Sequence, residues 1–178
     1  MNLKDLAEDL IFIEKIDSID PLMFHEIANN TEWDDSMAAR KTASYGKPYN
    51  YNNMTYAEKK FPAYISELAK IVEERIYFDP NNCLINYYYK SDSKMGFHSD
   101  QIDILYENTG IAIFSLGSNR IMKFKNKKDK SISFEVELQS QSLIYMTQNF
   151  QNDWLHAILS SSQENNERIS ITFRKIKG

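Results

Sequence analysis

The sequence predicts an α+β fold, in which N-terminal helices pack on a β sandwich or barrel such as a jelly roll. Residues 1–78 carry helical periodicity, whereas the chain changes to short β-like runs from Cys83 onward. Turn-like breaks separate these runs, as in all-β sandwiches and barrels. The runs are residues 83–89, 110–116, 120–124, 131–138, 142–146, 155–160 and 168–174.

Three helices are predicted in the N-terminal part. Apolar residues recur at three- and four-residue spacing in residues 3–13, which indicates a short amphipathic helix. Asp20 and Pro21 introduce a second helix with an acidic cap. Residues 55–76 form the clearest pattern, with apolar side chains on one side. Residues 37–53, rich in Tyr, Gly, Pro and Asn, are predicted to be a loop or an irregular hairpin.

Length and composition indicate one domain that can bury a core. The chain has 178 residues, of which 42% are hydrophobic and 13% aromatic, so intrinsic disorder is excluded as its main state. We therefore expect a single domain over residues 1–178, with a helical or lid extension at 1–78 and a jelly-roll core at 83–176.

Cysteine content and hydropathy exclude several protein classes. Cys83 is the only cysteine, which excludes a disulfide framework and a Cys-rich zinc module and fits a cytoplasmic location. No apolar run is long enough to span a membrane. The net charge of -4 makes attraction of the whole surface to nucleic acid implausible, so such binding would need a local basic patch.

His98, Asp100 and His156 are the candidate metal ligands. His98 and Asp100 are two residues apart, so on an extended segment both side chains point the same way. His156 lies in a later β-like run and can come from a facing strand. Two histidines and one carboxylate form the facial arrangement that holds non-haem Fe(II) and leaves open positions. A capped turn remains the alternative for His98 and Asp100.

The last β-like run, residues 168–174, pairs two arginines. Arg168 and Arg174 are six residues apart, so both face the same side of a strand while the intervening apolar residues fill the core. Arginine suits a dianionic ligand because its planar group binds a carboxylate at two points. Asn86 and Tyr88 likewise share a strand face and can hydrogen-bond one carboxylate. The alternatives are ordinary surface charges and aromatic packing.

The order of these motifs resembles that of the AlkB family of Fe(II)- and 2-oxoglutarate-dependent dioxygenases. The matching stretches lie between about residues 83 and 176, with a weaker likeness upstream in ARKTASYGKPYNY, which resembles the base-recognition loop of family members. They are CLINYYY, GFHSD, SLGSNRIMKF, the segment around LHAI, and RISITFRKI.

The resemblance implies a double-stranded β-helix (jelly roll) core and an iron site. It makes His98, Asp100 and His156 the Fe(II) ligands. Arg168, helped by Tyr88, would bind the distal carboxylate of 2-oxoglutarate. Arg174, with Asn86, would bind the carboxylate beside the keto group. O2 is the co-substrate, and the family chemistry converts 2-oxoglutarate to succinate and CO2 while hydroxylating a C–H bond. A hydroxylated N-methyl group then breaks down to formaldehyde and the free amine.

Two departures from the family pattern bear on the substrate. Many DNA-repair members carry an acidic residue one or two places after the metal aspartate, where this chain has Gln101 and Ile102. Asp103 comes one residue later. The usual asparagine in the final arginine motif is Ser170. These changes bear on alkylated-base specificity and leave the iron chemistry untouched.

Six residues are candidates for contacting the substrate. They lie in the loop from Arg40 and near the metal motif, and a separate cluster of five lysines at a predicted hairpin offers phosphate contacts. Lysines that protect a sheet edge are the alternative for the cluster, and a lid is the alternative for the loop. The candidates are Arg40, Tyr45, Tyr49, Tyr51, Gln101 and Trp154; the lysines are Lys123, Lys125, Lys127, Lys128 and Lys130.

The resulting prediction is a monomeric dioxygenase that removes alkyl groups from N-alkylated bases in DNA or RNA. The same chemistry on a free nucleoside, a small metabolite or a protein side chain is the alternative. A non-catalytic binding module of the same fold is a further one.

Overall fold

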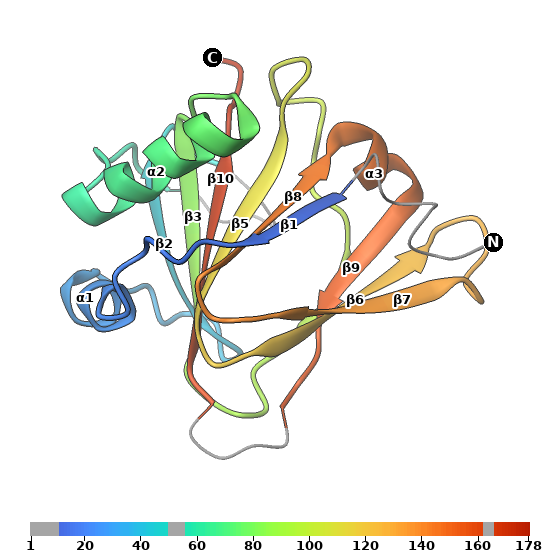
Figure 1. Cartoon of the computed structure of the whole chain (residues 1–178), viewed down its shortest axis with the longest axis horizontal. Coiled ribbons are helices and arrows are strands. Elements are labelled where there is room, and N and C mark those ends of the chain that lie inside the picture. Colours follow the sequence, from blue (N-terminus) through green and yellow to red (C-terminus); the bar gives the residue numbers. More distant parts are fainter. Residues whose placement is uncertain (1–10, 50–55, 162–165) are drawn as a thin grey trace.

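The computed structural model describes residues 11–49, 56–161 and 166–178 (Figure 1). Within these ranges the chain forms three helices and ten strands. In chain order they are β1 (Ile11–Lys15), α1 (Met23–Asn30), β2 (Lys41–Gly46), α2 (Ala63–Ile76), β3 (Asn82–Tyr88), β4 (Met95–His98), β5 (Gly110–Gly117), β6 (Arg120–Asn126), β7 (Ser133–Leu138), β8 (Ser142–Thr147), α3 (Gln148–Asp153), β9 (Trp154–Ile158) and β10 (Arg168–Arg174).

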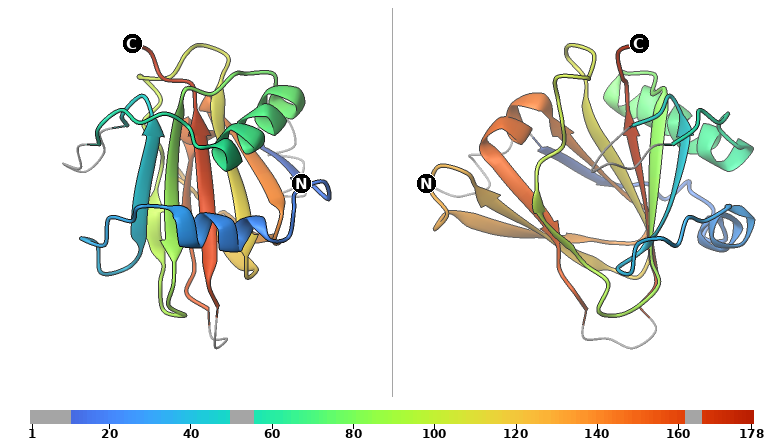
Figure 2. Two further views of the ribbon diagram at one scale, coloured as in Figure 1. Left: turned by 90° about the vertical axis from the view of Figure 1, so that its left-hand side faces the viewer. Right: turned by 180° about the vertical axis from the view of Figure 1, so that it is seen from behind.

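The strands form two antiparallel sheets that face each other (Figures 1 and 2). The larger sheet has the order β1-β8-β5-β10-β3-β2 and the smaller has the order β4-β9-β6-β7. Strands that are neighbours in space are often distant in sequence, as β10 lies between β5 and β3. This arrangement is the predicted α+β fold with a double-stranded β-helix core.

Helices α1 and α2 lie across the outer face of the larger sheet (Figure 2). Their apolar sides, including Ile27 and Leu68, join one buried cluster with the outward-facing residues of β10. Those strand residues, Ile169, Ile171 and Phe173, are fully buried, as the sequence predicts. Alternation along a strand therefore leaves the arginines of β10 on the opposite face, between the sheets.

A second apolar cluster fills the space between the sheets. Ile111 and Ile144 from the larger sheet belong to it together with Met122, Phe124 and Ile158 from the smaller sheet. This cluster fixes the separation of the sheets and so the width of the space that the polar residues enclose.

The N-terminal segment departs from the helix predicted for residues 3–13. Residues 3–10 lie outside the described residues, and Ile11–Lys15 forms β1 instead of the end of a helix. β1 pairs antiparallel with β8, from Ile11 beside Met146 to Lys15 beside Ser142. The helical prediction is therefore wrong for this part, because pairing along the open edge of β8 outweighs a short helical periodicity.

The predicted helix over residues 55–76 begins later, at Ala63. Pro62 precedes its first residue, and a proline disfavours helical geometry in the residue before it. Lys59 instead bridges to Gly46, which ends β2. β2 itself occupies Lys41–Gly46, within the stretch predicted as loop; part of that stretch, residues 50–53, lies outside the described residues.

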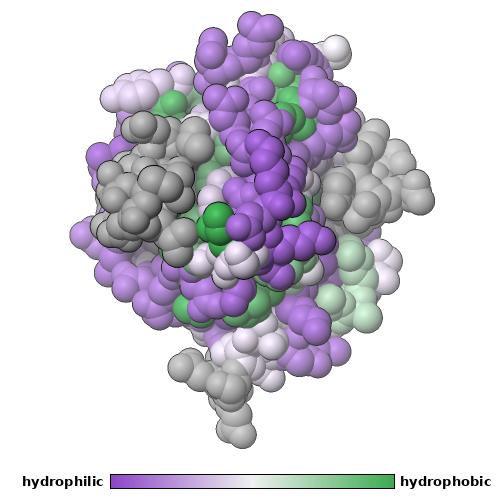
Figure 3. Space-filling model, turned by 90° about the vertical axis from the view of Figure 1, so that its right-hand side faces the viewer, coloured by the Kyte–Doolittle hydropathy of each residue, from purple (hydrophilic) through white to green (hydrophobic). Residues whose placement is uncertain are grey.

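The seven predicted β-like runs all contain strands of the structure, β3 and β5–β10. On the face shown in Figure 3, hydrophilic residues cover most of the coloured surface and hydrophobic residues form small separate groups. Among the described residues, no helix has the length and apolar character needed to cross a membrane.

Candidate active site

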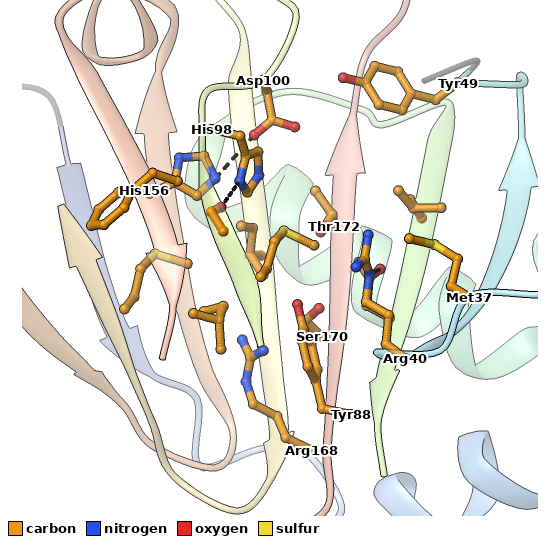
Figure 4. Close-up of a pocket in the computed structure, with 18 of the residues that line it drawn as sticks. Met37, Arg40, Tyr49, Tyr88, His98, Asp100, His156, Arg168, Ser170 and Thr172 are labelled. Carbon is orange, nitrogen blue, oxygen red and sulfur yellow. Dashed lines mark hydrogen bonds and ion pairs between the residues drawn. The ribbon is translucent and has the colours of Figure 1, made fainter. Parts of the chain in front are cut away.

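A cavity of about 340 Å³ lies between the two sheets. Its wall on the larger sheet comes from β3 and β10, and its wall on the smaller sheet comes from β4 and β9. In Figure 4, His98, Asp100 and His156 lie toward one end of the cavity, and Arg168 and Tyr88 lie toward the other. Arg40 and Met37 approach from the N-terminal extension.

The three predicted metal ligands converge. His98 ends β4 and is the register partner of His156 in β9, and their ring centres are 4.3 Å apart. Asp100 follows β4, with its Oδ2 atom 3.4 Å from Nε2 of His156. One nitrogen or oxygen atom from each residue lies within 4.8 Å of the other two. This spacing fits a single ion, and the donor set is the one that holds non-haem iron.

The neutral state of His156 and the hydrogen bond of His98 suit metal binding. Burial lowers the pKa of His156 to about 4, although the charge of Asp100 opposes this shift. The imidazole is therefore neutral near pH 7 and offers a lone pair. Nδ1 of His98 lies 2.8 Å from the carbonyl oxygen of Gly96 and donates its proton there. Nε2 of His98 is then left as the free ligand atom.

Asp100 stays ionised in spite of its burial. Burial would raise the pKa of this carboxyl, but the charge of Arg174, together with His156 and His98, outweighs that effect and lowers it. Nη2 of Arg174 donates to Oδ1 of Asp100, and Gln151 Oε1 accepts from the Asp100 backbone N–H at 3.0 Å. One carboxylate oxygen is thus held by the arginine, and the other faces the histidines.

Arg168 is a buried cation with few partners. Its side chain is 1% exposed, and its Nη2 donates to Oγ of Ser115 at 2.8 Å. Its guanidinium carbon lies 5.2 Å from the centre of the Tyr88 ring. Nε and Nη1 have no hydrogen-bond partner among the described residues. An isolated buried charge is costly, so unpaired donors facing a cavity fit an anionic ligand.

Arg174 lies nearer the metal ligands, opposite Asn82 on β3. Its Nη1 is 3.5 Å from Oδ1 of Asn82, and its guanidinium carbon lies 4.1 Å from the centre of the Tyr49 ring. Nε of Arg174 has no partner among the described residues. The two arginines of β10 therefore face the same cavity at different depths, as the spacing in the sequence predicts.

Asn86 and Tyr88 share the face of β3 that lines the cavity, as predicted. Asn86 is the register partner of Ser170 and not of Arg174. Its Oδ1 accepts a hydrogen bond of 2.7 Å from Nε of Arg40. Since the oxygen is occupied, the amide nitrogen of Asn86 is the atom left to donate to a carboxylate.

The residues predicted to contact the substrate divide into several groups. Arg40 and Tyr49 line the cavity. Tyr49 is only 2% exposed and stacks on Arg174, so the structure places it inside the site and not on an open rim. Gln101 is exposed, with its backbone N–H donating to the Tyr49 hydroxyl at 3.4 Å. Tyr51 lies outside the described residues.

Tyr45 and Trp154, which were also predicted to contact the substrate, do not line the cavity. Tyr45 packs against the core beneath the helices. Trp154 is 4% exposed and stacks on Phe150, with the ring planes only 4° apart and the centres 5.7 Å apart. Each side chain points to the face of its strand that packs against an apolar cluster.

The predicted lysine cluster does surround a hairpin, between β6 and β7. Lys123 pairs with Glu135 at 2.8 Å and Lys128 with Asp153 at 2.9 Å. Nζ of Lys127 donates to the Gln151 carbonyl, and Lys125 lies over the ring of Phe97. Much of the cluster therefore contacts this chain itself.

The fold and the site define an iron-dependent oxygenase with a double-stranded β-helix core. A model of the 2OG-Fe(II) oxygenase superfamily matches residues 7–174. The chain therefore belongs to the 2OG-Fe(II) oxygenase superfamily, whose cofactors are Fe(II) and 2-oxoglutarate. His98, Asp100 and His156 form its metal-binding triad.

Individual relatives add the AlkB likeness. An uncharacterized protein R406 of Acanthamoeba polyphaga mimivirus is 32% identical over 127 residues, which is 71% of this chain and 65% of that protein. The alpha-ketoglutarate-dependent dioxygenase alkB homolog 3 of Mus musculus is 26% identical over 149 residues, covering 77% of this chain and 51% of the relative. The chain thus spans less than two thirds of each of these relatives.

A solved structure, that of OsALKBH1, shares the fold. It superposes with a TM-score of 0.71 at 14% identity, covering 93% of this chain and 97% of the other. The likeness therefore supports the double-stranded β-helix fold of this chain.

Some residues of the site carry no signal in the sequence. Met37 lines the cavity, Asn82 accepts a hydrogen bond from Arg174, and Gln151 accepts one from the backbone of Asp100. None of the three belongs to a motif recognised in the sequence. Arg120 belongs to the stretch SLGSNRIMKF and is buried, but the spacing of residues in the sequence does not predict what its side chain contacts. Only the three-dimensional packing of the chain brings these residues to the region of the cavity.

Proposed function

We propose that this oxygenase removes alkyl groups oxidatively from N-alkylated nucleobases in DNA or RNA. The observation that carries the proposal is the cavity. The iron triad lies toward one end, Arg40 reaches the cavity from the N-terminal extension, and two buried arginines on its wall have nitrogen atoms without hydrogen-bond partners among the described residues. The likeness to alkB homolog 3 supports the same reading.

The co-substrate is proposed to lie along β10. Arg168 and Tyr88 bind the distal carboxylate of 2-oxoglutarate, since Arg168 is a cation without an anionic partner. Arg174 and the amide nitrogen of Asn86 bind the carboxylate beside the keto group. When iron and 2-oxoglutarate are bound, O2 would be the oxidant for C–H hydroxylation, and the oxidative decarboxylation of 2-oxoglutarate to succinate would supply two of the four electrons that O2 takes up. The pKa shifts of Asp100 and His156 favour the ionised carboxylate and the neutral imidazole that ligation needs.

The size of the cavity limits how a nucleic acid can enter. Its volume of about 340 Å³ is at the lower end of small-molecule sites, about 300–1,000 Å³. That space suits the co-substrate and one base-sized group, so a base of a duplex would have to leave the stack. Arg40 lines the cavity, and Gln101 follows Asp100 at the end that holds the triad.

A free nucleoside or small metabolite is the second candidate substrate. It is favoured by the burial of Tyr49 and by the packing of the half-buried Tyr45 against the core, which leave two of the predicted stacking residues unable to stack on a base at the surface. The internal partners of Lys123 and Lys128 likewise reduce the basic surface available to phosphates.

The test is a product screen with Fe(II) and 2-oxoglutarate. Methylated single- and double-stranded oligonucleotides, the matching nucleosides and unmethylated controls are compared for succinate, formaldehyde and loss of the methyl group by mass spectrometry. The proposal expects turnover on oligonucleotides. Turnover on nucleosides alone would replace it with the second candidate.

The screen is paired with a measurement of salt dependence. Binding to a single strand should weaken with a log–log slope of about -0.7 per phosphate contacted. Replacing Lys125 with Gln should flatten the slope if the hairpin takes part, and the exposed Lys70 of α2, which lies outside the hairpin, serves as the matched control when changed in the same way. Absence of both binding at low salt and turnover would contradict a nucleic-acid substrate.

A further inference from the structure

Arg120 is a second buried arginine near the Arg168 end of the cavity. It begins β6 and is 2% exposed. Nε and Nη2 donate to the carbonyl oxygen of Leu159 at 3.2 and 2.8 Å, and Nη2 also donates to the carbonyl oxygen of Ser93. Nη1 has no hydrogen-bond partner, and no ion pair joins Arg120 to a carboxylate among the described residues.

These carbonyl contacts do not explain a charged side chain. A neutral donor would satisfy both carbonyl groups without the desolvation cost of a buried cation. Burial indeed lowers the pKa of Arg120, with Tyr88 opposing the shift. A reason for the charge must therefore come from the residues around it.

Tyr88 connects Arg120 to the cavity. Arg120 does not line the cavity, but its guanidinium carbon lies 5.7 Å from the centre of the Tyr88 ring, and that of Arg168 lies 5.2 Å from the same centre. The two charges are therefore at most about 11 Å apart, which is close enough to interact in a buried setting. Two cations share one aromatic ring at this end of the cavity.

We propose that Arg120 is a positioning residue that makes the site select a 2-oxo dicarboxylate over a 2-oxo monocarboxylate. It holds Tyr88 beside Arg168 and adds a second positive charge behind the ring. The distal carboxylate of the co-substrate is the anion that both charges attract. This inference rests on the orientation of 2-oxoglutarate given under the proposed function, and it is independent of the nucleic-acid substrate.

A purely structural role for Arg120 predicts something different. Ser93 precedes β4 and Leu159 follows β9, and these strands carry His98 and His156. If Arg120 only fixed the ends of these strands, its replacement would weaken metal binding and would affect all 2-oxo acids equally. Selectivity between acids is therefore the measurement that separates the two roles.

The experiment compares 2-oxoglutarate with pyruvate, which has the same 2-oxo acid group but lacks the distal carboxylate. Both are titrated by calorimetry into the Mn(II)-loaded protein without nucleic acid, and Mn(II) affinity is measured separately. The variants are Arg120→Gln, which keeps donors without the charge, and Arg120→Lys, which keeps the charge. Lys123→Gln on the same strand is the matched control, and Arg120→Met is used if Arg120→Gln does not fold.

Arg120→Gln should weaken 2-oxoglutarate binding by about 10-fold, as expected for one charge at this distance, and leave pyruvate and Mn(II) unchanged. Arg120→Lys should stay within about threefold of the unmodified protein, because the charge that attracts the carboxylate remains. Equal losses for both acids, or no loss, would overturn the proposal. An Arg168→Met variant that kept its preference for 2-oxoglutarate would overturn the co-substrate orientation as well, whereas failure of the oligonucleotide screen would affect neither.

Discussion

Replacing Arg168 with methionine should stabilise the protein in the absence of ligands while removing its response to 2-oxoglutarate. Burial lowers the pKa of Arg168 from 12.5 to about 10. A shift of this size corresponds to about 3 kcal/mol by which the folded state disfavours the charge. Losing the hydrogen bond to Ser115 offsets about 1 kcal/mol. The net gain is therefore about 2 kcal/mol.

The sign of the pH effect fixes the conditions of this measurement. The folded pKa lies below the unfolded one, so the cost of the charge is fully present at all pH values below about 10 and declines as the pH rises above that. Melting experiments at pH 7.5 on metal-free protein thus capture the whole effect. A gain of about 2 kcal/mol should raise Tm by roughly 4–8 °C for a chain of this length.

Two comparisons make the Arg168→Met experiment decisive. Millimolar 2-oxoglutarate should raise Tm of the unmodified protein and have little effect on Tm of Arg168→Met, because that variant lacks the cation that binds the distal carboxylate. Ser115→Ala, which removes the hydrogen-bond acceptor and keeps the charge, should lower Tm. A lower Tm for Arg168→Met than for the unmodified protein would refute the view that Arg168 is an uncompensated charge awaiting an anion.

Three further predictions concern the metal end of the cavity. His98→Ala or Asp100→Ala should abolish Fe(II) binding and turnover, since each removes one of three ligands; full activity of either variant, assayed by succinate formation, would contradict the triad. Arg174→Ala should weaken 2-oxoglutarate binding by about 10- to 150-fold, the equivalent of 1.5–3 kcal/mol for a charge-assisted contact; calorimetry that finds unchanged affinity would place the cofactor elsewhere. The metal-free protein should gain stability as the pH rises from about 4 to 6.5, because burial lowers the pKa of His156 and the unfolded chain therefore binds more protons in that range. Thermal melts over this pH range measure the gain. An equally steep rise in the His156→Gln variant would show that His156 does not cause it.

The pairing of His98 with Asp100 and the face of β10 were predictable because they depend only on local rules. Alternation along an extended strand is enough to place Arg168 and Arg174 together and to separate them from Ile169. The pairing of His98 with His156 needed the additional likeness to a known family, because no periodicity relates residues 58 positions apart. The spacing in the sequence and the family resemblance together therefore identified all three metal ligands.

Strands β1 and β2 were not predicted, because they depend on contacts between distant segments. β1 forms because the edge of β8 is open to it, and β2 forms because it pairs with β3, from Lys41 beside Tyr87 to Gly46 beside Asn82.

Helix α3 was also not predicted. It follows a side-chain cap in which the Thr147 hydroxyl accepts a hydrogen bond from the Phe150 backbone N–H. The short run between β8 and β9 carries too few residues to show a periodicity.

Substrate residues were the hardest to predict, because an aromatic side chain in a loop can face either way. Tyr49 and Tyr45 look alike in sequence, yet one covers Arg174 in the cavity and the other packs under α2. Composition distinguishes neither from a surface residue. Their separation reflects the course of β2 and the chain that follows it, which only the three-dimensional structure defines.

The charges around the cavity have a consequence for the order in which ligands bind. Among the described lining residues, Arg40, Arg168 and Arg174 are cationic, and Asp100 is the single carboxylate. A divalent cation entering alone would meet an already positive site, and a dianion entering alone would have no metal to chelate. Each therefore reduces the electrostatic cost of the other, and thermodynamic linkage requires this coupling to be reciprocal. Iron affinity and 2-oxoglutarate affinity are accordingly one joint property of the site, so a measured constant for either has meaning only with the concentration of the other stated.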